Sequence, residues 1–181
     1  MKLQPDRAEV GGLVFERRRG LTQADAGGAQ AGEGAAAARR IRGGGLASWT
    51  APCAALAHQI DGQARASRRA GHLVTARGQY PRASNHYRMP GHPGHNELFA
   101  SSRASFGKAI ACGLPAEPTG MPFEGRRLPG YFIRGRCGRA PAPALIAHAG
   151  FESTAEELYH WIGAHAADRG WNCLVFEGPG Q

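Results

Sequence analysis

The chain has 181 residues and a formal net charge of +8, and its positive charge comes almost entirely from arginine because only two lysines are present. No apolar run approaches the roughly 18 to 20 residues of a membrane span, and no signal-peptide core stands near the start. We therefore expect no membrane-spanning segment and a cytoplasmic location. The four cysteines form no Cys-x-x-Cys pair, which indicates neither a disulfide framework nor structural zinc.

The first 45 residues are rich in glycine and alanine and show no sustained apolar periodicity. A composition of this kind buries little apolar surface and is typical of disorder or of a linker. The first folded region is therefore expected to begin near residue 46.

The range 46–112 is predicted to be helical, because apolar residues recur there at helical spacing. Pro90 and Pro93 are expected to end the helix that precedes them. The stretches that carry the helical pattern are 51–60, 64–76 and 96–111.

Three histidines, His86, His92 and His95, fall within ten residues of one another and invite comparison with a metal site. No carboxylate or cysteine stands at a supporting spacing, and the intervening prolines and glycines give a loose frame. We therefore predict a solvated loop here, with no metal and no cofactor.

Two apolar strands joined by a helix are predicted near the end of the sequence. The run 144–148 is typical of a strand buried on both faces of a parallel sheet, and a second strand is expected at 172–176. Ser153 and Thr154 each precede a glutamate by three residues, so two overlapping capping boxes mark the helix start. Gly170 is expected at its end. Together these elements make a βαβ unit.

The helix of this unit is predicted to bury one apolar face against the sheet. The residues at the corresponding spacing are Leu158, Trp161, Ile162 and His165.

Ligands of such units bind at the carboxyl ends of the strands, which here are followed by residues 148–153 and 177–181. The turn at Gly150 leads into a helix N-terminus. The backbone N–H groups of Gly150, Phe151 and Glu152 are therefore placed to point at a developing oxyanion.

Four segments carry a resemblance to a known family: YPRASNHYR at 80–88, PFEGRRLPGYF at 122–132, GFESTAEELY at 150–159 and FEGPGQ at 176–181. In this order they resemble the α/β-hydrolase branch that has an N-terminal helical cap. That branch includes dihydroxypseudooxynicotine hydrolase and related esterase-like and carbon–carbon hydrolases. The resemblance covers roughly residues 46–181.

The resemblance implies an α/β fold in which a helical cap at 46–116 is followed, at 117–181, by the first part of an α/β-hydrolase sheet. That part is an antiparallel hairpin at 119–134 and the βαβ unit, and the sheet is incomplete. It also implies a small-molecule substrate for the complete family protein.

The resemblance further implies an oxyanion hole formed by the Phe151 N–H, with Gly150 shaping the turn. Glu152, Tyr87 and His86 are the candidates for substrate contacts. Tyr87 and His86 have the alternative role of holding the cap helices together, and Glu152 that of an acidic residue stabilised by the helix dipole.

The family nucleophile is a serine in Gly-x-Ser-x-Gly, followed by an acid and a histidine. None of the seven serines here has glycine at both flanking positions, so no catalytic nucleophile, acid or base is assigned. We therefore expect an N-terminal, catalytically incomplete fragment of a hydrolase. In the family strand order the strand at 144–148 would be left as an open sheet edge, which predicts self-association.

Two other interpretations stay open. In one, the chain is a non-enzymatic basic protein that binds an anionic partner such as nucleic acid, although its arginines are scattered and do not favour this. In the other, the chain is complemented by assembling with a second polypeptide.

Overall fold

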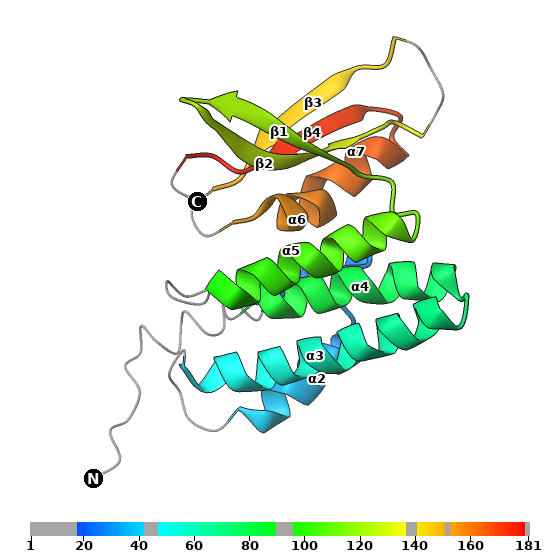
Figure 1. The fold of residues 1–181 in the computed structure, drawn as a ribbon, viewed down its shortest axis with the longest axis vertical. Coiled ribbons are helices and arrows are strands. Elements are labelled where there is room, and N and C mark those ends of the chain that lie inside the picture. Colours follow the sequence, from blue (N-terminus) through cyan, green and yellow to red (C-terminus); the bar gives the residue numbers. More distant parts are fainter. Residues whose placement is uncertain (1–17, 42–46, 90–95, 137–140, 151–152, 180–181) are drawn as a thin grey trace. The chain divides into compact units, whose positions relative to one another are not determined.

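The computed structural model describes residues 18–41, 47–89, 96–136, 141–150 and 153–179, which divide into two compact units (Figure 1). The first unit is Met1–Gly113 and the second is Leu114–Gln181. Within the described ranges, no helix combines the length and the apolarity that a bilayer crossing requires.

Three long helices form most of the first unit: α3 (Ala47–Arg69), α4 (Leu73–Arg88) and α5 (Asn96–Ala111). The middle helix α4 packs against both α3 and α5 (Figure 1). The helix predicted at 64–76 is instead divided between α3 and α4. Gly71 has a φ of 80°, a left-handed conformation that glycine adopts without strain, and this ends α3.

The core of the first unit lies along α4, whose residues from Tyr80 to Arg88 are buried with the exception of Arg82. Between α4 and α5, the Ser102 hydroxyl donates to the Ser84 carbonyl oxygen at 2.9 Å. One apolar cluster of this unit consists of Ala37, Leu56, Ala57, Ile60, Ala83 and Tyr87.

Part of the range expected to be a linker is folded. A short 3₁₀ turn, η1 (Ala24–Ala26), precedes helix α2 (Ala31–Arg40), and Ala37 of α2 is buried in the apolar cluster. The segment before α2 is held by the buried Asn85 side chain of α4. Its Nδ2 donates to the backbone carbonyl oxygens of Gly20 (3.0 Å) and Gly28 (2.7 Å). Ala29, Gly34 and Ala37 are buried, so residues 31–40 form a packed helix where a linker was expected.

The second unit is a four-stranded mixed sheet with one helical segment, built from β1 (Glu117–Phe123), β2 (Arg126–Ile133), β3 (Ala144–His148) and β4 (Asn172–Phe176). The strand order is β1-β2-β4-β3. Strand β2 pairs antiparallel with both β1 and β4, whereas β3 runs parallel to β4. The predicted hairpin and βαβ unit are both present.

The hairpin turn between β1 and β2 consists of Glu124 and Gly125, with φ values of 45° and 75°. Two consecutive positive φ values give the turn that matches the right-handed twist of the flanking strands.

The helical segment joining β3 to β4 begins as α6 (Ala155–Leu158), widens into the π-helical segment η2 (Tyr159–Gly163) and ends as α7 (Ala164–Asp168). Gly170 follows with a φ of 82°, as predicted for the end of this helix. Side chains on the two sides of η2 fall out of the ordinary helical register because the π turn inserts an extra residue.

The prediction that β3 is buried on both faces is wrong. Its residues alternate between exposed and half-buried, and Ile146 is 69% exposed. In the part of the chain that the structure describes, β3 pairs only with β4 and forms one edge of the sheet. The open edge expected at 144–148 is therefore present.

Candidate functional site

The carboxyl ends of β3 and β4 meet at one edge of the sheet. The parallel register pairs Ala144 with Asn172 and His148 with Phe176, so the two strands end side by side. Just beyond β3, the Ala149 N–H donates to the Phe176 carbonyl oxygen at 2.8 Å. The segment that links β3 to α6 therefore leaves the sheet from a fixed position, at the edge where ligands of such sheets bind.

Of the predicted oxyanion residues, Gly150 is described and lies exposed at this edge, where its carbonyl oxygen accepts from the Ser153 N–H at 3.1 Å. Phe151 and Glu152 lie outside the described residues. The Phe151 N–H as oxyanion donor and Glu152 as a substrate contact therefore stay predictions.

The start of α6 shows the N-cap half of one predicted capping box. Thr154 is the N-cap, in an extended conformation, and its hydroxyl oxygen accepts from the Glu157 N–H at 3.3 Å. The Ser153 hydroxyl instead donates to Glu157 Oε2 at 2.8 Å. The side chains of Ser153 and Thr154 thus stabilise the N-terminus of α6.

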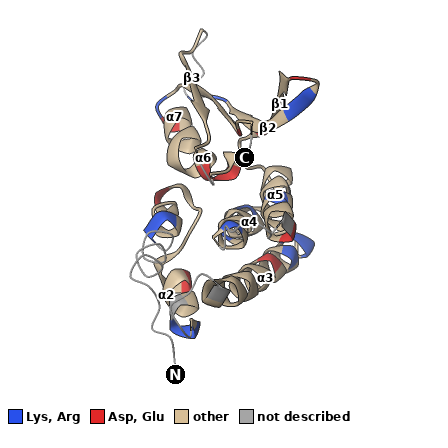
Figure 2. Ribbon diagram, turned by 90° about the vertical axis from the view of Figure 1, so that its left-hand side faces the viewer, with Lys and Arg blue, Asp and Glu red and all other residues tan. Residues whose placement is uncertain are grey.

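Three buried carboxylates lie at this helix start: Glu156, Glu157 and Glu177. The first two belong to α6, whose acidic residues are red in Figure 2. Glu157 accepts from Ser153, as described above. Glu156 Oε1 accepts from the Tyr131 hydroxyl of β2 at 2.6 Å. Glu177 Oε1, from the residue after β4, accepts from the Ala155 N–H at 3.2 Å. The positive end of the helix dipole favours negative charge at this position.

A cavity of about 460 Å³ opens at the same edge, beside the β1–β2 hairpin and the end of β4. The buried Glu177 contributes to its wall. The other lining residues are Phe123, Glu124, Arg126, Arg127, Leu128, Pro129, Gly178 and Pro179.

His148, the last residue of β3, is exposed, and its Nδ1 lies 2.9 Å from the Ala149 carbonyl oxygen. Its ring also lies against Phe176, with ring centroids 6.2 Å apart. These local contacts keep the imidazole beside Ala149, at the end of β3.

The two substrate-contact candidates in the first unit are buried in packing contacts. The Tyr87 hydroxyl lies 2.8 Å from His58 Nδ1, and burial raises the pKa of this phenol. His86 is 1% exposed, and its Nε2 lies 3.8 Å from Glu33 Oε2 of α2. These contacts match the alternative role of holding the helices together, and a role in substrate binding stays a prediction.

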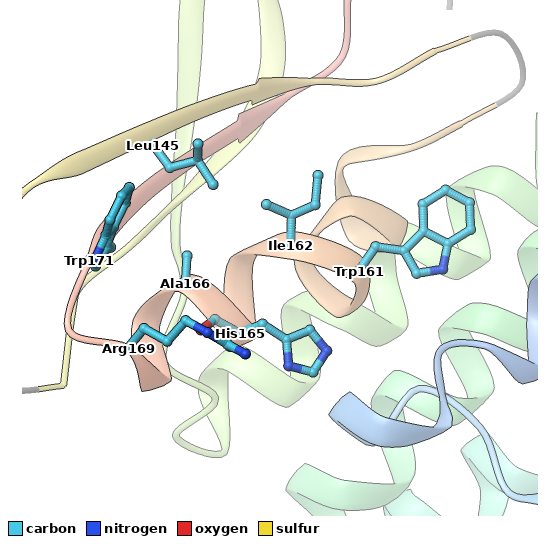
Figure 3. Close-up of a pocket in the computed structure, with 7 residues that line it drawn as sticks. All are labelled: Leu145, Trp161, Ile162, His165, Ala166, Arg169 and Trp171. Atoms are coloured by element: carbon cyan, nitrogen blue, oxygen red, sulfur yellow. The ribbon is translucent and has the colours of Figure 1, made fainter.

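A second cavity, of about 490 Å³ and mainly apolar, lies between the β3 edge and the helical segment (Figure 3). Three residues of the predicted apolar face, Trp161, Ile162 and His165, line this cavity instead of a closed core. The wall is completed by Leu145, Ala166, Arg169 and Trp171.

Within the described ranges, no three His, Cys, Asp or Glu side chains are grouped so that they could hold a metal ion. His92 and His95 lie outside those ranges.

Sequence reasoning missed the contacts of Glu177 and Tyr131 with the start of α6. The position of Glu177, directly after a parallel strand and before Gly178, was a usable signal. The identity of its partner depends on the tertiary packing of β4 beside α6, which no local pattern reveals.

No known protein-family profile matches the chain. The chain is 34% identical over 192 residues to a protein named hydrolase acrC from Aspergillus aculeatus, a match that covers 92% of this chain and 44% of the relative. It is also 34% identical over 179 residues to α/β hydrolase xenA from Xenoacremonium sinensis, covering 92% of this chain and 42% of that one. The chain thus spans less than half the length of these curated relatives.

The crystal structure of 2,6-dihydroxy-pseudo-oxynicotine hydrolase superposes with a TM-score of 0.72 at 23% sequence identity, over 89% of this chain and 46% of that one. This likeness concerns the fold. A helical region followed by a mixed sheet with a βαβ unit defines an α/β protein built like part of a hydrolase. With its curated relatives, the chain belongs to the α/β-hydrolase superfamily.

Proposed function

We propose that this chain contributes a helical cap and the oxyanion side of the active site to an ester or carbon–carbon bond hydrolase with a small-molecule substrate. The observation that carries the proposal is the segment between β3 and α6, which starts at the carboxyl edge of the sheet and leads into a capped helix N-terminus. The hydrolase names of the curated relatives support it.

In the proposed reaction, a serine attacks the substrate carbonyl carbon while a histidine takes the serine proton. Backbone N–H groups near Gly150 would then stabilise the oxyanion. None of the seven serines of this chain is flanked by two glycines. We infer that the serine, the acid and the histidine are contributed by residues other than these 181, and that the chain alone does not hydrolyse substrate.

The range 46–116 is proposed as the cap that shapes the substrate pocket of the complete protein. The packing of α4 between α3 and α5 supports this, because it gives a helical body with its own core. His86 and Tyr87 would then act on the pocket through the packing of α4.

The test is to supply the absent half. The chain is fused to the portion of the acrC protein that the match does not cover, and the product is assayed with p-nitrophenyl esters and with a vinylogous diketone. The controls are the 181-residue chain alone and a fusion in which the serine of any Gly-x-Ser-x-Gly motif in the added portion is alanine. We expect turnover from the intact fusion only. A folded fusion that is inactive on both substrate types would contradict the proposal, and so would turnover that survives the serine-to-alanine change.

The alternative of a basic protein that binds nucleic acid makes a different prediction. Its affinity would fall steeply between about 50 and 200 mM salt, because phosphate contacts release counterions. Arginines lie at the ends of several elements (blue in Figure 2), among them Arg39 and Arg40 in α2 and Arg68 and Arg69 in α3. Fluorescence anisotropy with a labelled duplex measures this directly.

We also propose that the β3 edge is covered by another polypeptide segment, the remaining part of the complete family protein being the occupant. The support is the apolar cavity beside this edge (Figure 3), together with the 69% exposure of Ile146. In the chain alone, the open edge would drive self-association. Sedimentation of the chain and of Ile146→Lys tests this, because the lysine should shift the chain toward monomer.

A cytoplasmic location is proposed on the state of the cysteines. Cys53, Cys112 and Cys173 are free and buried, as is usual for proteins of reducing compartments. Cell fractionation with a tagged chain is the measurement.

A further inference from the structure

The end of β4 holds the segment between β3 and α6 at two points. On the upstream side, the Ala149 N–H donates to the Phe176 carbonyl oxygen at 2.8 Å. On the downstream side, the Ala155 N–H donates to Glu177 Oε1 at 3.2 Å. Two consecutive residues of one strand end thus anchor both flanks of the same segment.

Glu177 is itself held in place. Its backbone N–H donates to the Pro129 carbonyl oxygen of β2 at 2.9 Å, which fixes the main chain beyond β4 to the neighbouring strand. Its side chain is only 5% exposed, so water does not compete freely for the carboxylate. The Ala155 N–H is one of the four N–H groups at the start of α6 that have no partner within the helix.

We propose that Glu177 is a positioning residue for the proposed hydrolase. Its carboxylate holds the first N–H of α6, and through α6 it sets the place where the segment after Gly150 enters the helix. Since backbone N–H groups of an oxyanion hole must be held in position before the reaction, this contact acts on catalysis through geometry. The inference rests on the proposed function, whereas the contact itself can be tested without it.

Three substitutions distinguish the effect of the carboxylate charge from the effect of the side-chain length. Glu177→Ala removes the acceptor. Glu177→Asp keeps the charge but withdraws it by one methylene, and Glu177→Gln keeps an oxygen at the same reach without the charge. Glu117→Ala is the matched control, because it removes an exposed carboxylate of β1 that pairs with Arg134 in the same unit.

The first measurement is amide hydrogen exchange at Ala155, resolved by NMR in the 181-residue chain. A lost hydrogen bond to a charged acceptor corresponds to an increase in exchange of about tenfold or more. We expect that increase in Glu177→Ala and Glu177→Asp, a smaller one in Glu177→Gln and none in Glu117→Ala. Unchanged exchange in folded Glu177→Ala would overturn the proposal. If Glu177→Ala does not fold, exchange in Glu177→Asp equal to that of the parent chain would do the same.

The second measurement uses the active fusion described above. We expect Glu177→Ala to lower kcat by about tenfold or more with KM little changed, since removing oxyanion stabilisation acts on the transition state. Glu177→Gln should retain most of the activity. Faster exchange at Ala155 combined with an unchanged kcat would overturn the positioning role. A fusion that is inactive with Glu177 intact contradicts the proposed function alone, and the exchange data still decide whether Glu177 holds α6.

Discussion

The buried pair of Tyr131 and Glu156 gives the sharpest test of how the helix start is held on the sheet. The tyrosine hydroxyl donates to Glu156 Oε1 at 2.6 Å, a length typical of a hydrogen bond to a charged carboxylate. The two residues are 6% and 4% exposed, so water cannot readily replace the lost donor. Tyr131→Phe leaves no cavity of note and should lower the free energy of unfolding of the second unit by about 2 kcal/mol, within the range of about 1.5–3 for charged groups.

A double-mutant cycle isolates the contribution of the pair. Glu156→Gln keeps an acceptor oxygen without the charge, and in that background Tyr131→Phe should cost only about 1 kcal/mol, as for a neutral hydrogen bond. The coupling between the two positions should therefore be about 1 kcal/mol.

The assay is urea unfolding of the four chains, followed by circular dichroism and by tryptophan fluorescence, to which Trp161 and Trp171 of the second unit contribute. Retained circular dichroism spectra show that each variant still folds. If Tyr131→Phe costs the same in both backgrounds, or less than about 0.5 kcal/mol in either, the reasoning about this buried pair is refuted.

Three further predictions concern packing, pH and the segment before α2. Gly130→Ala would place a Cβ 2.5 Å from the Val175 carbonyl oxygen, a backbone atom that cannot move aside, and should destabilise by about 1–3 kcal/mol in urea unfolding. The control Gly107→Ala meets nothing within 4 Å in α5 and should stabilise by about 0.5–1 kcal/mol, so equal unfolding midpoints would contradict the prediction. Burial raises the pKa of the Cys53 thiol from 9.0 to about 12, because it disfavours the thiolate. The free energy of unfolding is therefore unaffected by this thiol below pH 9. Between pH 9 and about 12 it falls by about 1.4 kcal/mol per pH unit, because the thiol then ionises only in the unfolded chain. Cys53→Ala should remove that part of the alkaline slope, and an unchanged slope would show that this thiol is not its source. Asn85→Ala leaves two backbone carbonyl oxygens before α2 without its amide, so limited proteolysis should cut residues 18–30 faster than in the parent chain; equal rates would show that this side chain does not hold the segment.

The elements of the second unit could be predicted from the sequence because their signals are local. The alternating and apolar runs, the Thr154 cap and the glycine at 170 each act within a few residues of the element they define. The full exposure pattern of β3 could not be predicted in this way. It depends on how many strands flank β3 and on what covers each face of the sheet.

Helix α2 was missed because its glycines and alanines have the composition of a linker. Gly34 shows the physical reason: a Cβ added there would lie 2.8 Å from the Leu21 Cδ2 atom. The small residue permits close packing, yet composition alone does not distinguish a packed glycine from a flexible one.

Near the candidate site, the sequence predicted where β3 and β4 end and where α6 begins, because strand ends and caps are local features. The contacts of Glu177 with Ala155, and of Tyr131 with Glu156, join residues more than 20 positions apart. Contacts of this kind become visible only when β2, β4 and α6 are assembled.

The position of β4 has a consequence for how the sheet is made during synthesis. β4 is the only described strand that pairs with both β2 and β3, and it is also the last of the four to leave the ribosome. Until then, β3 has no neighbour in the described sheet, and the hairpin is an isolated pair, which is marginally stable at best in water. The helices of the first unit are complete earlier, because α5 ends at Ala111. Until residues 172–176 have left the ribosome, the chain therefore carries a hairpin and a strand that are not joined to each other, after a helical unit that has already had time to fold.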